Sequence, residues 1–446
     1  MFSKILIANR GEIAVRIIRA CKEMGIGTVA VFSEADRDAL HVSMADESVC
    51  IGPAPVKDSY LNIPAILTAA VQTGAQAVHP GYGLLSENAR FAELCESCNL
   101  TFIGPGHKTI SLMGDKDAAK KLMAQSGIPV IPGSDIITDV DMVEKEARRI
   151  GFPLLIKARS GGGGRGIRLV NSIEEVRPTF LAAQTEAANA FGDGACFLEK
   201  FVSPVKHVEM QVIVDNYGNV VCLGERDCSV QRKNQKIIEE SPCAVLPEST
   251  RQRMMEASIK AVEASGYRGV GTIEYLLDKD NNFYFLEMNT RLQVEHPVTE
   301  MVTGIDLVKW QIRVAAGLKL EFTQQDVTLN GSAIECRINA ENPAFDFKPS
   351  CGKIELLHIP GGPWVRFDTS LYQGYVIPPY YDSMMGKLIV HAKTRAEAIR
   401  KMQAALCELV IEGVDNNIDL LIEILDDEEF KKGTYSTGFM KKRKWF

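Results

Sequence analysis

The sequence predicts an α/β protein in three parts, an α/β (α+β) mixture in which each part has its own helices and strands. In the first part, short β-prone runs alternate with helical stretches, which is typical of a parallel sheet covered by helices. A glycine-rich loop and, further on, a β-hairpin mark a second part. The length of 446 residues also favours roughly three domains, at about 150 residues each.

The first part, residues 1–113, is expected to be the parallel α/β unit. Its strands are predicted at residues 4–8, 28–32, 77–79 and 101–103, and its helices at residues 12–24, 63–73 and 88–97. Ligand-binding groups gather at the carboxyl ends of parallel strands. Two loops follow such strands, at residues 9–12 and 79–83. We therefore expect both loops to lie at the ligand-binding edge.

The second and third parts are predicted to span residues 114–330 and 331–446. In the second part we expect a strand at residues 154–157, a β-rich stretch at 197–225 and a helix at 248–265. In the third we expect strands at residues 332–338 and 387–392, and helices at 395–408 and 417–426. This mixture predicts that the third part is also α/β.

Composition excludes several classes of protein. The 50 basic and 57 acidic residues leave a net charge of −7, which argues against a nucleic-acid-binding or membrane-surface protein. No apolar run approaches the roughly 18 residues of a membrane span, and charge interrupts the N-terminus too early for a secretory signal. The eleven cysteines are scattered, which favours free thiols in a reducing compartment. We therefore expect a cytoplasmic enzyme.

A glycine-rich loop at residues 161–166 follows the β-prone run that contains Lys157. The loop matches G-x-G-x-x-G, but a β-prone run follows it, whereas the dinucleotide fingerprint needs a helix there. A Walker A sequence is absent from the chain. The remaining interpretation is a hairpin loop whose backbone N–H groups approach a polyphosphate, with Lys157 adding a positive charge. The alternative is a flexible surface loop without a ligand.

The predicted hairpin places two glutamates opposite each other. Two β-prone runs, residues 271–278 and 283–289, flank a turn rich in Asp and Asn. If Asp278 pairs with Phe283, Glu274 faces Glu287 across the strands. Facing carboxylates repel each other, and a cation between them reverses that effect. Oxygen ligands of this kind suit Mg²⁺ bound to a substrate phosphate.

A polar row continues beyond this hairpin. Alternate residues are polar and point one way if the extended backbone continues: Glu287, Asn289, Arg291, Gln293 and Glu295. The alternative is a half-exposed strand with a solvated polar face. The facing carboxylates favour a ligand-binding function, because a solvated strand gains nothing from them.

These residues resemble the ATP-grasp superfamily, and residues 1–440 resemble biotin carboxylase. Two motifs are similar to ones shared with carbamoyl-phosphate synthetase: FPLLIKA at 152–158 and LEMNTRL at 286–292. Five are typical of biotin carboxylase: IANRGEIA at 7–14, HPGYG at 79–83, ERDCS at 225–229, QVEHP at 293–297 and PYYDSM at 379–384. The resemblance implies a Rossmann-like N-terminal domain, an ATP-grasp domain with a mobile lid at about residues 130–203, and a C-terminal mixed α/β domain.

The resemblance also implies the reaction, which is Mg-ATP-dependent carboxylation of biotin by bicarbonate through carboxyphosphate. It assigns residues to the ATP site: Lys116, Lys157, Gly163, Gly164, Glu199, Lys200, Val202, His207, Gln231, Glu274 and Glu287. The lysines at 116 and 157 are expected at the phosphates, and residues 199, 200 and 202 at the adenine. The metal ligands are expected to be Glu274, Glu287 and Asn289, which would hold Mg²⁺ or Mn²⁺.

Catalysis and binding of the other substrates are assigned in the same way. The implied catalytic residues are Lys236, Arg291, Glu295 and Arg337, with Glu295 as the base that deprotonates bicarbonate. Gln293 and Val294 would complete the bicarbonate site with Lys236 and Arg291. Arg337 would stabilise the developing negative charge on biotin, and Tyr82 would lie near the biotin.

The partners follow from what the chain lacks. It has no Ala-Met-Lys-Met motif for biotin attachment and no region that resembles a carboxyltransferase. We therefore expect biotin on a biotin carboxyl carrier protein, together with carboxyltransferase subunits and a homodimer of this chain. The leading interpretation is the biotin carboxylase subunit of acetyl-CoA carboxylase, in fatty acid synthesis. The alternatives are a pyruvate or other acyl-CoA carboxylase, a different ATP-grasp carboxylate–amine ligase, and a non-catalytic binding partner.

Two residues depart from the pattern of the family. Asn234 stands where many relatives have histidine, and Arg159 stands where they have a small residue. Neither departure removes an expected catalytic group. We expect them to affect nucleotide affinity and the geometry of the lid hinge.

Overall fold

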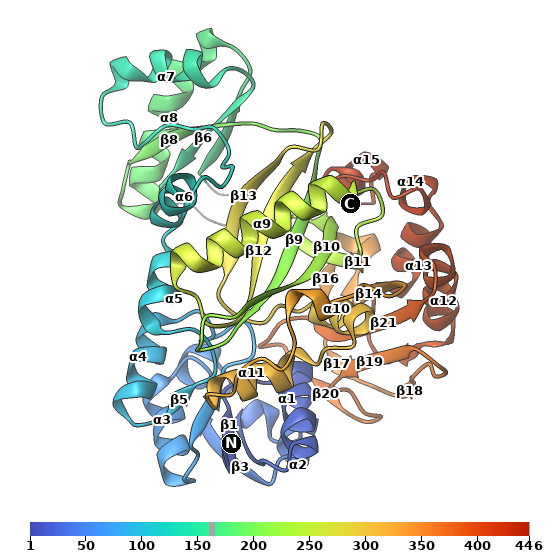
Figure 1. Cartoon of the computed structure of the whole chain (residues 1–446). Helices are drawn as coiled ribbons and strands as arrows, with labels where there is room; N and C mark the ends of the chain where they lie inside the picture. Colours follow the sequence, from blue (N-terminus) through green and yellow to red (C-terminus); the bar gives the residue numbers. More distant parts are fainter. Residues whose placement is uncertain (160–165, 446) are drawn as a thin grey trace.

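The computed structural model describes residues 1–159 and 166–445 (Figure 1). The chain starts as a five-stranded parallel sheet in the order β3-β2-β1-β4-β5, as the alternating pattern predicts. Its strands are β1 (Lys4–Ile7), β2 (Gly27–Ser33), β3 (Glu47–Gly52), β4 (Ala77–His79) and β5 (Thr101–Phe102). Its helices are α1 (Gly11–Glu23), α2 (Leu40–Met44), α3 (Ile63–Gln72), α4 (Ala89–Ser97) and α5 (His107–Gly114). The sequence pattern missed β3, most of whose residues are not fully buried.

An eight-stranded antiparallel sheet forms the centre, in the order β13-β12-β9-β10-β11-β14-β21-β19. The central strands are β9 (Val205–Val214), β10 (Val220–Arg232), β11 (Gln235–Ser241), β12 (Gly269–Asp278) and β13 (Phe283–Asn289). Three strands of the expected third part continue the sheet: β14 (Ser332–Asn339), β19 (Val365–Thr369) and β21 (Met384–Ala392). The sheet thus crosses the boundary expected near residue 331, which remains a prediction.

Alternation along the central strands gives the sheet one apolar and one polar face. On β9, Val208, Met210 and Val212 pack in a core with helix α9 (Glu248–Ser265), which lies across one face of the sheet (Figure 1). The residues that alternate with them, among them His207 and Glu209, point to the opposite face. That polar face is covered by α10 (His296–Thr303), and α11 (Leu307–Ala315) follows. The expected site residues of β9 to β13 therefore gather on the face opposite α9, beside an apolar core that this face shares with α1 and α11.

A smaller unit stands apart at the top left of Figure 1. It contains a three-stranded antiparallel sheet in the order β7-β6-β8, with β6 (Leu154–Ala158), β7 (Ile167–Val170) and β8 (Cys196–Lys200). Helices α7 (Val143–Ile150) and α8 (Ile173–Phe191) complete it, and α6 (Lys116–Gln125) leads into it. The unit has its own hydrophobic core. This is the arrangement expected of the lid, whose mobility remains a prediction.

The C-terminal residues cover the other end of the central sheet. Four helices pack against that end of the sheet: α12 (Arg395–Glu408), α13 (Ile418–Asp426), α14 (Glu428–Lys431) and α15 (Phe439–Arg443). Short strands pair as β15 (Glu341–Asn342) with β16 (Lys348–Pro349), β17 (Gly352–Lys353) with β20 (Val376–Ile377), and β18 (Leu356–His358) with β22 (Val410–Glu412).

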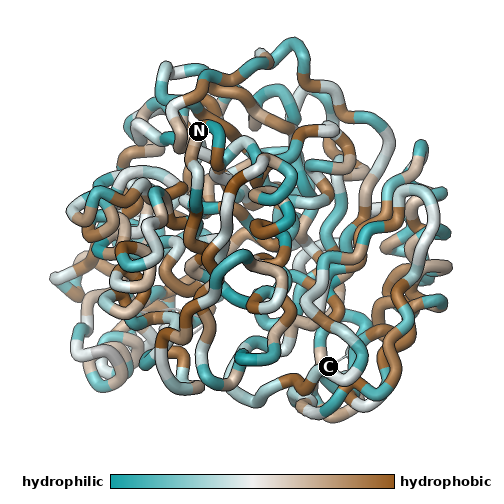
Figure 2. The backbone as a smooth tube through the Cα atoms, turned by 90° about the horizontal axis from the view of Figure 1, so that it is seen from below, coloured by the Kyte–Doolittle hydropathy of each residue, from teal (hydrophilic) through white to brown (hydrophobic). Residues whose placement is uncertain are grey.

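The pattern of hydropathy agrees with this layered fold. Hydrophobic and hydrophilic stretches alternate along the chain (Figure 2). Among the described residues, no helix has the length and apolar character needed to cross a membrane. All eleven cysteines are free, as the sequence predicts.

Candidate active site

Two glutamates face each other across the β12–β13 pair, as the hairpin pattern predicts. Glu274 is the direct cross-strand partner of Glu287. Near the turn, however, Leu277 and not Asp278 pairs with Phe283. A one-residue register shift in β13, between residues 285 and 287, restores the match of the glutamates. The predicted carboxylate pair is confirmed, and the predicted register at the turn is wrong.

The turn explains the wrong register, because Asp278 shapes it with its side chain. The Oδ1 oxygen of Asp278 accepts hydrogen bonds from the backbone N–H groups of Asp280 and Asn282, both at 2.9 Å. Asn281 adopts the left-handed conformation, with φ of 61°, which asparagine tolerates well. The turn therefore draws Asp278 out of its pairing with Phe283.

Glu274 is buried and surrounded by donors. Its Oε2 oxygen lies 2.9 Å from Nε2 of His207. Its Oε1 oxygen accepts hydrogen bonds from Lys236, Asn289 and Gln293 at 2.9, 3.0 and 2.7 Å. Burial raises the pKa of Glu274, but Lys236 and His207 outweigh that effect and hold the pKa well below its ordinary value. Glu274 is therefore a carboxylate at neutral pH.

The opposed carboxylates fit a magnesium ion. Glu287 is partly exposed, and its Oε2 oxygen lies 3.5 Å from Nζ of Lys116, at the start of α6. Asn289, at the end of the same strand, contributes a third oxygen. A cation would offset the repulsion between the facing glutamates, and Mg²⁺ favours such oxygen ligands together with phosphate. These three residues, expected as metal ligands, are brought together on one face of the hairpin.

Lys236 ties three buried carboxylates together. Its Nζ lies 2.6 Å from Oε2 of Glu209, 2.9 Å from Oε1 of Glu274 and 2.6 Å from Oε1 of Glu295. His207, Glu209 and Glu274 could together hold a metal ion, and so could Glu209, Cys228 and Glu295. The Lys236 ammonium contacts the carboxylates of both groups. In this conformation it supplies the positive charge that both groups need.

Glu295 also contacts a second cation, Arg337 of β14. The Nη2 atom of Arg337 lies 3.1 Å from Oε2 of Glu295, and its Nε lies 2.7 Å from Oε1 of Glu239. Burial raises the pKa of Glu295, but Lys236 and Arg337 hold the pKa well below its ordinary value. Glu295 is thus ionised and able to accept a proton. The expected base and three expected binding residues, Lys236, Gln293 and Arg337, lie in one hydrogen-bonded cluster.

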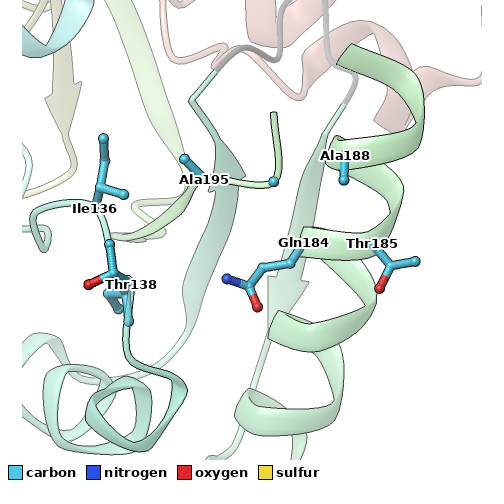
Figure 3. A pocket seen from close by; sticks show the side chains of 8 residues that line it. Ile136, Thr138, Gln184, Thr185, Ala188 and Ala195 are labelled. Atoms are coloured by element: carbon cyan, nitrogen blue, oxygen red, sulfur yellow. The ribbon is translucent and has the colours of Figure 1, made fainter. Parts of the chain in front are cut away.

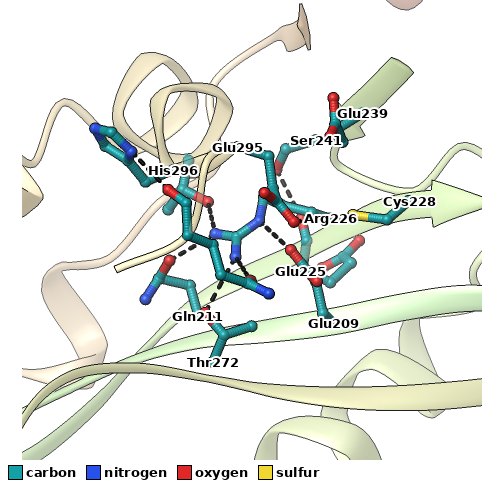
Figure 4. Close-up of polar contacts among 12 residues, drawn as sticks. Glu209, Gln211, Glu225, Arg226, Cys228, Glu239, Ser241, Thr272, Glu295 and His296 are labelled. Atoms are coloured by element: carbon teal, nitrogen blue, oxygen red, sulfur yellow. Dashed lines mark hydrogen bonds and ion pairs between the residues drawn. The ribbon is translucent and has the colours of Figure 1, made fainter. Parts of the chain in front are cut away.

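The fully buried Arg226 lies beneath this cluster and hydrogen-bonds to several of the elements that carry it (Figure 4). Its guanidinium donates to Glu209 at 2.6 Å, to Gln293 at 2.7 Å and to Gln211 at 2.6 Å. It also donates to the hydroxyls of Thr272 and Thr299. These partners come from β9, β12, α10 and the segment before α10. Arg226 therefore fixes the strands and helix that carry the site.

Sequence reasoning assigned no role to Arg226, Glu209 or Glu239, although Arg226 lies inside the ERDCS motif at 225–229. Glu239 was hidden by a change of register. Gln231 pairs with Lys236, but Val230 pairs with Ile238, so β11 contains one extra residue between the two pairs. Residues three apart, Lys236 and Glu239, can then share a face. Strict period-two alternation separates them.

Arg291, Gln231 and Val294 border the cluster. Arg291 donates to Oε2 of Glu87 at 2.7 Å and to Oδ1 of Asn289 at 2.9 Å. Gln231 donates to the carbonyl of Cys228 at 3.1 Å, and its Nε2 lies 3.4 Å from Nδ1 of His207. The carbonyl of Val294 accepts a hydrogen bond from Lys387 at 2.6 Å. The expected nucleotide and bicarbonate residues of the central sheet therefore adjoin the cluster.

Another group of expected ATP residues lies on the lid. Lys157 of β6 forms an ion pair with Glu199 of β8. Lys200 donates to the carbonyl of Phe152 at 2.6 Å, and Val202 is the second residue after the end of β8. Gly163 and Gly164 lie outside the described residues. These described residues therefore lie in the lid. Lys116 of α6 links them to the β12–β13 hairpin through its ion pair with Glu287.

The two loops of the N-terminal sheet lie against each other. The side-chain amide of Asn9 donates to the carbonyls of Pro80 and Tyr82 at 2.7 and 2.8 Å. The Tyr82 hydroxyl donates to Glu12, and burial together with Glu12 raises its pKa well above the ordinary value. Tyr82 also lies near Lys387, whose Nζ is 5.8 Å from the ring centre. Tyr82 thus remains a neutral donor at the edge of the site.

The two residues that depart from the family pattern lie at turns. Asn234 is at the tip of the β10–β11 hairpin, with φ of 67°, a conformation that asparagine adopts readily. Arg159 follows β6 and pairs with Asp193 at 2.9 Å. Neither side chain belongs to the cluster around Lys236.

Two cavities lie away from this cluster, in the lid and at its hinge. The first, of about 530 Å³, is lined by Ile136, Thr138, Gln184, Thr185, Ala188 and Ala195, among others (Figure 3). The second, of about 890 Å³, lies between α6 and residues 130–139. Neither cavity is lined by the carboxylates or cations of the cluster.

A small α/β unit beside a sheet that carries paired carboxylates is the layout of an ATP-grasp enzyme. Family models match the whole layout: "Biotin carboxylase, N-terminal domain" at residues 1–110, "Carbamoyl-phosphate synthase L chain, ATP binding domain" at 115–323 and "Biotin carboxylase C-terminal domain" at 335–442. Biotin carboxylase 1 of Bacillus subtilis is 55% identical over 99% of this chain and 98% of its own length. The chain belongs to the biotin carboxylase family.

Solved structures agree. A biotin carboxylase complex with β,γ-ATP from Campylobacter jejuni matches with a TM-score of 0.94 and 49% identity, over 99% of both chains. The biotin carboxylase domain dimer of the 2-oxoglutarate carboxylase from Hydrogenobacter thermophilus, bound to MgADP and bicarbonate, matches with a TM-score of 0.92. It is 50% identical over 100% of this chain and 98% of that one.

Proposed function

We propose that this protein carboxylates biotin with bicarbonate at the expense of Mg-ATP. The observation that carries this proposal is the buried cluster in which Glu295 meets Lys236 and Arg337 beside the opposed carboxylates Glu274 and Glu287. Cations that hold a carboxylate base suit an anionic substrate, and the carboxylate pair suits a metal-bound nucleotide.

The proposed first step uses Glu295 as a base. Lys236 and Arg291 hold the bicarbonate, and Glu295 takes the proton from its hydroxyl. The bicarbonate oxygen then attacks the γ-phosphate and ADP leaves, so that carboxyphosphate forms. Two cations hold the pKa of Glu295 low in the structure. When Lys236 turns to the substrate anion, its effect weakens and Glu295 becomes a stronger base.

The nucleotide is held by residues of the sheet and of the lid. Glu274, Glu287 and Asn289 would hold Mg²⁺, which would neutralise phosphate charge. Lys116 and Lys157 bind phosphate oxygens, and lid closure excludes the water that would otherwise hydrolyse carboxyphosphate.

In the second step, carboxyphosphate breaks down to CO₂ and phosphate. The phosphate removes the proton of the biotin ureido nitrogen, and that nitrogen attacks CO₂. Arg337 donates to the oxygen on which charge develops, and Glu239 orients its guanidinium. Tyr82 borders the biotin site as a neutral hydroxyl donor.

The biological setting is proposed from the relatives and the sequence. Biotin arrives on a separate biotin carboxyl carrier protein, and carboxyltransferase subunits use the product. We place the chain in acetyl-CoA carboxylase, working as a homodimer in the cytoplasm, where free cysteines are usual. A 2-oxoglutarate carboxylase subunit as the setting is a second candidate, because such a relative is 50% identical over 99% of this chain.

Phosphate release tests the proposal. ATP hydrolysis is measured with Mg²⁺ and bicarbonate, with and without free biotin, for the wild type and for Glu295→Ala. We expect biotin-stimulated hydrolysis that requires bicarbonate and is lost in the variant. If the wild type binds ADP but responds neither to biotin nor to a biotinylated carrier, the chain is another ATP-grasp ligase or a binding partner.

A further inference from the structure

The buried carboxylate of Glu199 has two cationic partners. Glu199 is 8% exposed, and its Oε1 oxygen forms an ion pair with Lys157 of β6. Its Oε2 oxygen accepts a hydrogen bond from Lys120 of α6 at 3.0 Å. Burial raises the pKa of Glu199, but these two lysines outweigh it and lower the pKa below its ordinary value. Glu199 is therefore ionised and needs a positive charge beside it.

Nucleotide binding, as proposed above, would take one of these two lysines away from Glu199. Lys157 is expected to bind nucleotide phosphate, so its ammonium must turn partly or wholly from Glu199. A buried carboxylate that loses its counter-ion is strongly destabilising. Without a second cation, Glu199 would therefore compete with the nucleotide for Lys157.

Lys120 is built into the hinge in a way that keeps it beside Glu199. It lies on α6, where the chain leads into the lid, whereas Glu199 lies on β8 within the lid. The backbone of Gly133 pairs with that of Glu199 in an isolated antiparallel β-bridge. A Cβ atom on Gly133 would lie 3.3 Å from the Nζ of Lys120 and 2.8 Å from the carbonyl oxygen of Leu198. Lys120 thus reaches the carboxylate through space left by a glycine.

We propose that Lys120 is a positioning residue, the permanent counter-ion of Glu199, which frees Lys157 to bind nucleotide phosphate. This inference rests on the proposed function, because it assumes that Lys157 binds a nucleotide. Lys120 itself does not touch the nucleotide. Its contribution depends entirely on the charge of Glu199.

A double-mutant cycle tests this dependence. The dissociation constant of ADP with Mg²⁺ is measured by calorimetry for the wild type, Lys120→Met, Glu199→Gln and the double variant. We expect Lys120→Met to weaken binding about tenfold or more in the wild-type background, since Glu199 then retains Lys157. In the Glu199→Gln background the same change should alter binding less than about twofold, since a neutral amide needs no counter-ion.

Lys121→Met is the matched control. Lys121 is the next residue on α6, and it pairs with Asp135 at 3.0 Å on the surface, where both side chains are exposed. We expect its ADP affinity to equal that of the wild type. Melting temperatures of all variants with and without ADP show that each is folded.

The outcomes separate this inference from the function on which it rests. Failure of the wild type to bind ADP contradicts the proposed function. If the wild type binds ADP and Lys120→Met binds it equally well, Lys120 is not the counter-ion. If Lys120→Met weakens binding as strongly beside Glu199→Gln as alone, Lys120 contacts the nucleotide directly and the proposal is wrong.

Discussion

The ammonium of Lys236 lies 2.6 Å from Oε1 of Glu295, the carboxylate that we expect to act as the base. The same ammonium lies 2.6 Å from Glu209 and 2.9 Å from Glu274. One buried cation therefore holds the base, a structural carboxylate and an expected metal ligand at fixed positions. Its removal should affect chemistry more than any single surface charge.

Lys236→Gln should lower bicarbonate-dependent ATP hydrolysis by about 100-fold or more, because preorganised charge at the reacting anion is lost. The measurement is kcat for phosphate release at saturating ATP. Lys233→Gln is the control, since Lys233 lies on the same hairpin but is exposed and pairs with Asp346. Retention of more than a tenth of the wild-type rate by Lys236→Gln would contradict this role.

Glu287→Gln should raise the Mg²⁺ concentration needed for half-maximal ATP hydrolysis by about tenfold or more, since one of two carboxylate ligands is lost. The fold should persist, because Glu287 is partly exposed and lies outside the Lys236 cluster. Glu256→Gln, on the exposed side of α9, should leave the Mg²⁺ dependence unchanged. An unchanged dependence in Glu287→Gln would remove Glu287 from the metal site.

Stability should depend on pH through Glu239. Burial and the neighbouring Glu295 raise the pKa of Glu239 to about 7, despite the opposing effect of Arg337. Glu335, directly opposite on β14, is also buried, and burial raises its pKa well above the ordinary value. A carboxyl with a raised pKa stabilises the folded protein below its unfolded-state pKa, and this contribution is lost as the pH rises through the folded-state pKa.

Glu239→Gln removes this titration. The stability of the wild type relative to the variant should therefore fall by about 3 kcal/mol between pH 5 and pH 8 and stay constant at higher pH. Urea unfolding of both proteins at pH 5, 6, 7 and 8 measures the difference. A difference that is the same at every pH shows that Glu239 titrates at its ordinary value.

Arg226→Met should lower the free energy of unfolding by about 3–5 kcal/mol, because it leaves the carboxylate of Glu209 buried with a lost partner. Adding Glu209→Gln should recover part of that loss, since the buried charge that has lost one of its two cationic partners disappears. Thermal unfolding of the two single variants and the double variant measures the coupling. Additive losses would show that the two residues act independently.

The sequence predicts the elements whose local pattern agrees with their environment. The predicted helices at residues 248–265 and 395–408 coincide with α9 and α12. The parallel N-terminal sheet follows from alternating runs that local propensity and burial both favour. The expected strands and helices of the third part are also confirmed, although their strands extend the central sheet.

The parts that could not be predicted depend on departures from regular pairing. Glu274 faces Glu287 only because a one-residue register shift in β13 offsets the change of pairing that Asp278 causes at the turn. A similar shift in β11 places Glu239 near the site. Contacts such as Arg226 with Thr299 join residues 73 positions apart, and no local spacing indicates them.

The most direct test of the account is carboxybiotin formation. Transfer of label from ¹⁴C-bicarbonate to biotin, free or on a biotinylated carrier, is measured with Mg-ATP for the wild type and for Glu295→Gln. We predict labelled carboxybiotin from the wild type. With Glu295→Gln, the rate of label transfer should fall by about 100-fold or more at unchanged ADP affinity. Label transfer by Glu295→Gln at the wild-type rate would contradict the role of Glu295, and no transfer by the wild type to either acceptor would contradict the function.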